Sequence, residues 1–183
     1  LTYDRGFVSP YIDTDTSRME ADVDKPAILI TDKKISSAQE FLPILEKIAQ
    51  TGKKDLIIIA EDVEGEILGT LVLNKLKGVL NAVCVKAPAF GDRRKDVLND
   101  IAILTGAEVI TEDRGMTFEN VELDVVGSAR KVIVDKDNTT IIEGAGSATE
   151  IKARIDQIAG QAKASTSDYD KENLEKRRDA LSG

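Results

Sequence analysis

The chain of 183 residues contains no histidine, and this absence removes several kinds of catalysis. Without imidazole, neither Ser–His nor Cys–His activation of a nucleophile is available, and the most common general base and zinc ligand is missing. Tryptophan is also absent, and aromatic residues make up only 4% of the sequence. Most hydrolase mechanisms are therefore excluded, and we expect a core built from Ile, Leu, Val and Ala.

Cysteine is almost as scarce, since Cys84 is the only one. It lies in an apolar run, which favours a buried, inert thiol over a reactive one. No internal disulfide can form, which fits a reducing compartment. There is no apolar run long enough for a membrane helix and no basic leader followed by an apolar stretch. We expect a soluble protein of the cytoplasm, or of the matrix or stroma of an organelle.

Positive charge is in deficit, with 25 Lys and Arg residues against 33 Asp and Glu residues and a net charge of −8. A phosphate backbone or an anionic membrane surface would repel such a protein. Neither nucleic acid nor a membrane is an expected partner.

What the sequence does contain is an alternation of short β-branched runs with longer segments of helical period, typical of a parallel sheet with crossover helices. The length suits one α/β domain, spanning 1–183, and the ends at Leu1 and Gly183 suggest a fragment of a longer protein. The predicted strands are Ala27 to Thr31, Leu56 to Ala60, Ala82 to Lys86 and Glu108 to Thr111. The predicted helices between them are Ser37 to Gln50, Gly65 to Lys77 and Asp92 to Leu104, the first opened by a capping box and the others ended by Gly78 and Gly106.

The rest of the chain predicts a second layer. Arg130 to Val134 and Thr139 to Glu143 read as a β-hairpin, and two helices follow, from Ser147 to Lys163 and from about Asp168 to Leu181. Asp13 to Lys25, rich in charge, is expected to be a solvated loop or an irregular hairpin.

Sites for nucleotides or metals are weakly indicated. Gly144-Ala145-Gly146 follows a strand and opens a helix, but the rest of the dinucleotide-binding pattern is missing, and there is no phosphate loop of the Walker type. Glu61-Asp62 and Glu112-Asp113 are better explained as solvated strand ends than as acid/base pairs. No calcium-loop spacing is present. A small nucleotide-binding α/β enzyme that uses the Gly144 turn remains the alternative function.

The most informative feature is surplus apolar surface on two consecutive helices. Between Gly65 and Lys77 the apolar side chains sweep roughly 240° of the helix, although a one-sided surface helix needs little more than about 100°. The preceding helix carries two adjoining apolar stripes across roughly 160°. Pro43 and Gly69, both unfavourable inside a helix, fall in the same region.

Two interpretations of this surplus stay open. In the first, both helices are buried on two sides, by the sheet and by each other. In the second, the helices lie side by side, and each leaves one stripe to line an apolar groove, the kind of exposed patch that marks a partner site.

Specific motifs then point to a family. Residues 5–11 (RGFVSPY), 58–66 (IIAEDVEGE), 86–95 (KAPAFGDRRK) and 167–170 (SDYD) closely resemble the apical domain of group I chaperonins, the GroEL and Hsp60 family, and the likeness extends over essentially the whole chain. The resemblance implies an α/β fold layered as β/β/α, with a mainly parallel sheet flanked by helices, paired groove helices, a β-hairpin layer and C-terminal helices.

The resemblance also implies a function that is not enzymatic. The apical domain crowns a subunit of a seven-membered ring, and it binds hydrophobic segments of non-native proteins and the mobile loop of a co-chaperonin of the GroES or Hsp10 type. ATP and Mg²⁺ belong to the equatorial domain, outside this chain, so no cofactor is expected here. The binding residues implied by the resemblance come from an extended segment and from the two groove helices: Phe7, Tyr11, Ile12, Leu42, Leu45, Leu68, Val72 and Leu73.

Four positions depart from the family pattern. Ala89 stands where a glycine is usual, Ile12 where an aromatic residue is common, and Ile67 and Gly69 where alanines are typical. These departures affect the expected shape of the groove and its preference for clients.

Overall fold

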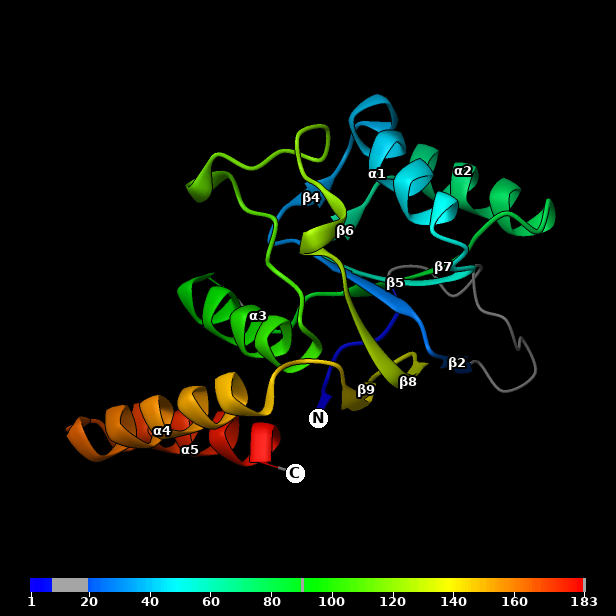
Figure 1. The fold of residues 1–183 in the computed structure, drawn as a ribbon. Coiled ribbons are helices and arrows are strands. Elements are labelled where there is room, and N and C mark those ends of the chain that lie inside the picture. Colours follow the sequence, from blue (N-terminus) through cyan, green and yellow to red (C-terminus); the bar gives the residue numbers. More distant parts are fainter. Residues whose placement is uncertain (8–19, 90, 183) are drawn as a thin grey trace.

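In the computed structural model, which describes residues 1–7, 20–89 and 91–182, the chain folds as a mixed α/β domain. The described residues form five α-helices, a seven-stranded mixed sheet and a separate two-stranded sheet. Figure 1 shows α1 and α2 above the parallel strands, with α3, α4 and α5 on the other side of them. The mixed α/β class predicted from the sequence is confirmed.

Three strands form the parallel part of the main sheet: β3 (Ala27–Ile30), β5 (Asp55–Ala60) and β7 (Asn81–Lys86). They lie in the order β3-β5-β7, with Ala27 opposite Leu56 and Leu56 opposite Ala82. Nearly all of their side chains are buried, because helices cover one face and the second layer covers the other, the usual situation of a parallel sheet.

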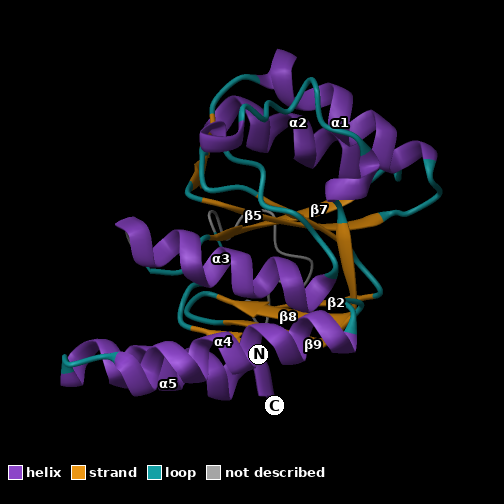
Figure 2. Cartoon of the chain, turned by 60° about the vertical axis from the view of Figure 1, so that its left-hand side comes forward, coloured by secondary structure: helices purple, strands orange, loops and turns teal. Residues whose placement is uncertain are grey.

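The antiparallel part is built around the hairpin of β8 (Gly127–Asp135) and β9 (Thr139–Gly144), which is longer than predicted. Asp135 Oδ1 closes its turn by accepting hydrogen bonds from the amides of Asp137 and Asn138 at 2.8 and 2.6 Å. β1 (Thr2–Tyr3) pairs with β9, and β2 (Glu20–Asp24) pairs with β8. The first residues of β8 also pair with β3, which joins the two parts. Figure 2 shows these strands as two layers.

The crossover helices are α1 (Ala38–Gln50), α2 (Gly65–Leu76) and α3 (Gly91–Thr105). Ser37 caps α1 as predicted, its side chain accepting the amide hydrogen of Glu40 at 3.3 Å. Gly78 and Gly106, which follow α2 and α3, have φ of +71° and +74°, a conformation that glycine adopts without steric cost.

The remaining elements are short or C-terminal. β4 (Lys34–Ile35) and β6 (Asp62–Val63) form the small parallel sheet, and two 3₁₀ turns lie at Glu112–Arg114 and Leu123–Val125. α4 (Ala148–Ala164), capped by Ser147, and α5 (Asp168–Ser182) pack against each other.

Alternate residues of the central strands enter two different cores. Leu29 and Ile58 face the core under α1 and α2, whereas Ile28 and Ile57 face the core shared with β8, β9 and α3. This division follows from the two-residue period of a strand.

Two expectations were wrong. Glu108 to Thr111 does not form a strand. Ile110 makes a single bridge to Thr31, because β8 occupies the beginning of the same edge of β3 and the chain turns at Glu112. The segment from Asp13 to Lys25 was expected to be irregular, yet Glu20–Asp24 is a regular strand with Ala21 and Val23 buried; residues 13–19 lie outside the described residues.

Candidate functional site

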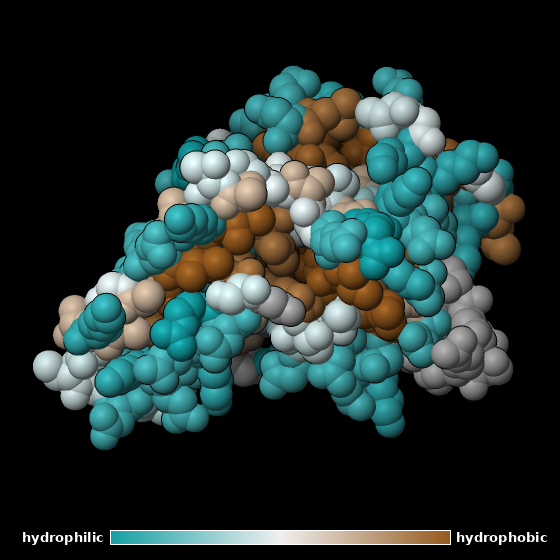
Figure 3. Space-filling view, turned by 60° about the horizontal axis from the view of Figure 1, so that its bottom comes forward, coloured by the Kyte–Doolittle hydropathy of each residue, from teal (hydrophilic) through white to brown (hydrophobic). Residues whose placement is uncertain are grey.

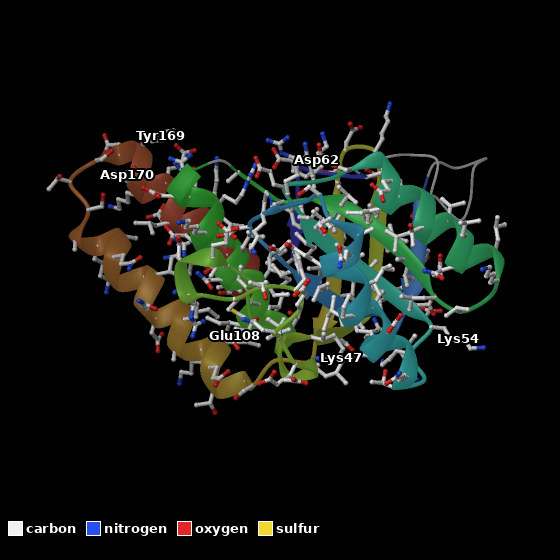
Figure 4. All side chains as sticks on the ribbon, turned by 90° about the horizontal axis from the view of Figure 1, so that it is seen from above. Lys47, Lys54, Asp62, Glu108, Tyr169 and Asp170 are labelled. Atoms are coloured by element: carbon white, nitrogen blue, oxygen red, sulfur yellow. The ribbon has the colours of Figure 1, made fainter. Side chains whose placement is uncertain are left out.

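Helices α1 and α2 lie side by side on the same face of the parallel sheet, as Figures 1 and 4 show from two directions. Both contribute to one core, through Phe41 and Ile44 of α1 and Ile67 and Leu71 of α2. Each helix thus directs one apolar stripe at the sheet.

The second apolar stripe of α2 is left partly exposed by the residues that the structure describes. Leu68 and Val72 are half-buried at the margin of the core, and Leu73 is 56% exposed. Beyond them Leu76 is 78% exposed and Val79 47% exposed. Within the described residues, α2 is therefore not enclosed on two sides, and leucines and valines remain in contact with solvent. We call Leu42, Leu68, Val72, Leu73, Leu76 and Val79 the apolar surface.

α1 contributes less to this surface than α2. Leu42 is half-buried, but Leu45 is only 3% exposed and belongs to the core. The segment after α3 occupies another side of α1, since Lys47 Nζ donates to the carbonyl oxygen of Val121 at 3.1 Å and the rings of Phe41 and Phe118 meet edge to face at 5.2 Å. Of the two expected binding residues on α1, Leu42 alone is therefore partly exposed.

The expected binding residues that the structure describes are therefore distributed over three environments. Leu42, Leu68, Val72 and Leu73 share the apolar surface, whereas Leu45 lies beneath it. Phe7 is 8% exposed and packs in the other core, where its backbone bridges to Val85. Tyr11 and Ile12 lie outside the described residues. The sequence does not indicate Leu76 or Val79 as binding residues, although Leu76 lies within the wide apolar arc of α2 that predicts such a surface.

Three of the four carboxylates in the two acidic pairs, Glu61, Glu112 and Asp113, are exposed and form ion pairs. Glu61 lies 3.8 Å from Arg94, Glu112 lies 3.6 Å from Lys33, and Asp113 contacts Lys95. Asp62, labelled in Figure 4, accepts the amide hydrogen of Val63 at 2.9 Å. These contacts agree with solvated carboxylates rather than with a pair arranged for proton transfer. Glu112 and Asp113, however, lie in a 3₁₀ turn and not at the end of a strand.

The Gly144 turn is packed against the end of α3. A Cβ atom at Gly144 would lie 2.2 Å from the carbonyl oxygen of Leu104, and one at Gly146 would lie 1.9 Å from that of Ile103. The amides of Ala145 and Gly146 donate to Ser128 and Leu104 at 3.0 and 2.9 Å. The two glycines thus allow close packing, and these two amides are already engaged instead of being directed at a phosphate.

A cavity of about 440 Å³ lies beside this turn, between β9 and the end of α5. Leu104, Ile141 and Leu181 line it together with Thr140 and Glu143. Figure 3 shows the face that carries the termini, where apolar residues gather among polar ones. The lining contains no nucleophile paired with a base, so the cavity offers no arrangement for covalent catalysis.

Burial makes the one thiol unreactive. Cys84 is fully enclosed in the core under α1 and α2, and this burial raises the pKa of its thiol to about 12. Because the thiolate is the nucleophile and the metal ligand, Cys84 has neither role at neutral pH.

Comparison of the chain with protein-family models finds no match. The described residues contain no cluster of three or more Cys, Asp or Glu side chains suited to holding a metal ion. In the same part of the chain, no helix combines the length and apolar character needed to cross a membrane.

Proposed function

We propose that this chain is a polypeptide-binding domain, the apical domain of a group I chaperonin, and that its apolar surface binds hydrophobic segments of non-native proteins and the mobile loop of a co-chaperonin. The observation that carries the proposal is the group of exposed apolar side chains at the end of α2 and just after it, Leu73, Leu76 and Val79. Contiguous exposed apolar surface is costly in water and marks interaction sites.

The sequence motifs supply the rest of the proposal. The strings at 5–11, 58–66, 86–95 and 167–170 resemble the chaperonin family, and the apolar surface lies on the helices to which that resemblance assigns binding. On this proposal the chain itself hydrolyses no ATP, and the parent protein forms a seven-membered ring whose nucleotide site lies elsewhere. No feature of the Gly144 turn favours the alternative of a nucleotide-binding enzyme.

The test is the affinity of the 183-residue chain for a fluorescently labelled amphipathic peptide with an apolar face. Leu73→Ser should weaken binding by about tenfold, because an apolar side chain buried in a complex contributes roughly 1.5–3 kcal/mol. Tyr169→Ser is the matched control: Tyr169 is 61% exposed, similar to Leu73, and Figure 4 places it at the far end of the molecule from α2. Equal losses in the two variants, or no binding by the unmodified chain, would overturn the proposal.

A further inference from the structure

Three loops meet at the edge of the parallel sheet where its strands begin. The first leads through Lys25 into β3, the second through Lys53 and Lys54 into β5, and the third runs from Lys77 at the end of α2 into β7. Lys53 Nζ donates to the carbonyl oxygen of Lys25 at 3.0 Å. The backbone amide of Asn81 donates to the carbonyl oxygen of Lys54 at 2.6 Å. The three loops are therefore neighbours.

This edge is positive although the chain as a whole carries −8. Its three loops contain four lysines against two aspartates, Asp24 and Asp55, and the carboxylate of Asp55 accepts a hydrogen bond from Asn81 at 3.1 Å. Lys25, Lys54 and Lys77 are exposed and form no ion pair with the described residues. We call Lys25, Lys53, Lys54 and Lys77 the lysine edge.

The lysine edge borders the apolar surface. Leu76, 78% exposed, directly precedes Lys77, and Val79, 47% exposed, lies two residues after it. Figure 4 shows Lys54 on the side of the molecule where α2 ends. The other end of α2 is acidic, because Glu64 directly precedes the helix and Glu66 lies in its first turn. Glu64 pairs with Lys34 at 3.4 Å. The apolar surface thus runs from an acidic end to a basic end.

We propose that the apolar surface selects hydrophobic polypeptide segments that carry acidic residues on one flank, and that the lysine edge binds this flank. The inference rests on the proposed function and specifies its substrate class. A segment seated along α2 would bring its flanking residues to Lys77 and Lys54, where carboxylates are attracted and ammonium groups repelled. Complementary charges around an apolar contact give specificity in this way, mainly by disfavouring the wrong partner.

The experiment compares three peptides that share one apolar core and differ only in a flank of three residues, either Glu, Ser or Lys. We expect the affinity to follow the order Glu, Ser, Lys. Because each exposed ion pair contributes modestly, neighbouring members of the series should differ by about threefold to tenfold at low salt. The differences should shrink in concentrated salt, which screens exposed charges.

Two matched double variants show whether the charge preference depends on the lysine edge. Lys54→Gln with Lys77→Gln should remove most of the difference in affinity between the Glu and Ser peptides, while the affinity of the Ser peptide changes little. Lys152→Gln with Lys171→Gln removes the same charge from exposed positions on α4 and α5, away from α2 in Figure 1, and should preserve the order. Urea midpoints of both double variants check that folding is intact.

The possible outcomes separate the inference from the proposed function. If none of the peptides binds, the proposed function fails. If all three bind with equal affinity, the function stands and the charge selection is wrong. Vesicles of phosphatidylcholine and phosphatidylserine in equal parts provide a third comparison. Vesicle binding that depends on Lys54 and Lys77, together with equal peptide affinities, would assign the lysine edge to a lipid surface and overturn the proposal.

Discussion

Asp100 of α3 and Arg177 of α5 form a bidentate ion pair, with Nε 2.7 Å from Oδ2 and Nη2 3.0 Å from Oδ1. The side chain of Asp100 is 3% exposed and that of Arg177 is 12% exposed. Arg154 of α4 reaches the same carboxylate, with its Nε 2.7 Å from Oδ1. One buried carboxylate therefore ties three helices together, and its hydrogen bonds offset the cost of removing the charges from water.

We expect Asp100→Asn to destabilise the fold by about 3 kcal/mol, because two largely buried guanidinium groups lose their counter-ion while the shape of the side chain is preserved. Asp179→Asn is the control: Asp179 is 72% exposed and pairs with Arg178 on the surface of α5, so its loss should change stability by less than about 0.5 kcal/mol. Urea unfolding measures both. Equal midpoints for the two variants would show that the buried pair contributes nothing beyond a surface pair.

Ala89 has a φ of +59°, in the left-handed region where a Cβ atom is unfavourable. Ala89→Gly should therefore raise the free energy of unfolding by about 1 kcal/mol, the relief of strain exceeding the added flexibility of the unfolded chain. Ala87, 1% exposed and without a positive φ, provides the comparison, since Ala87→Gly should lower stability. A destabilised Ala89→Gly variant would contradict this account.

Gly69 lies inside α2, and a Cβ atom added to it would meet no atom within 4 Å. Replacing glycine by alanine in a helix interior contributes about 1 kcal/mol, so Gly69→Ala should stabilise the fold by about that amount. Gly78→Ala has similar space but a φ of +71°, and it should destabilise by about 1 kcal/mol. Opposite shifts of the thermal midpoint in the two variants are the expected result, and shifts of the same sign would be a contradiction.

The sequence was most informative where local rules and packing agree. The strands β3, β5 and β7 are short apolar runs rich in Ile and Val. The helix ends at Gly78 and Gly106 carry glycines that suit a positive φ. All of these elements could therefore be predicted. Glu108 to Thr111 has the composition of a strand, but whether it pairs depends on β8, which arrives from far along the chain to share the edge of β3. The composition of residues 108–111 alone therefore cannot predict that β8 takes this place beside β3.

The candidate site was predictable to a similar degree. The width of the apolar arc on α2 indicates that some of its side chains stay uncovered, but it does not say which ones. The exposure of Leu73 and the burial of Leu45 follow from how α1 and α2 sit on the sheet and from the segment around Phe118 and Val121 that covers α1. The lysine edge is likewise invisible in sequence order, because its residues come from loops separated by whole helices.

The thiol of Cys84 should not react with a thiol reagent at pH 8 in the folded protein, since burial raises its pKa to about 12. Labelling should become rapid only across the urea transition, and labelling of the native chain at the rate of a free thiol would refute the burial. A pKa raised in the folded state also means that deprotonation favours unfolding. The buried thiol makes its full contribution to the free energy of unfolding below its unfolded-state pKa of about 9, and this contribution is lost as the pH rises from there toward 12. Cys84→Ala should therefore flatten the decline of the free energy of unfolding at alkaline pH.

Three consecutive residues of α2 differ in exposure: Leu71 is buried, Val72 is half-buried and Leu73 is exposed. An aspartate at each position therefore measures how far α2 is enclosed, whatever the surface binds. Leu71→Asp places a charge in the core and should cost more than about 4 kcal/mol, whereas Leu73→Asp should cost less than about 0.5 kcal/mol. Val72→Asp should fall between them, near 1–2 kcal/mol, because Val72 packs at the margin of the core. Urea midpoints rank the three variants. A large loss for Leu73→Asp would mean that α2 is covered on both sides, and the apolar surface would then be part of the core instead of a site open to a partner.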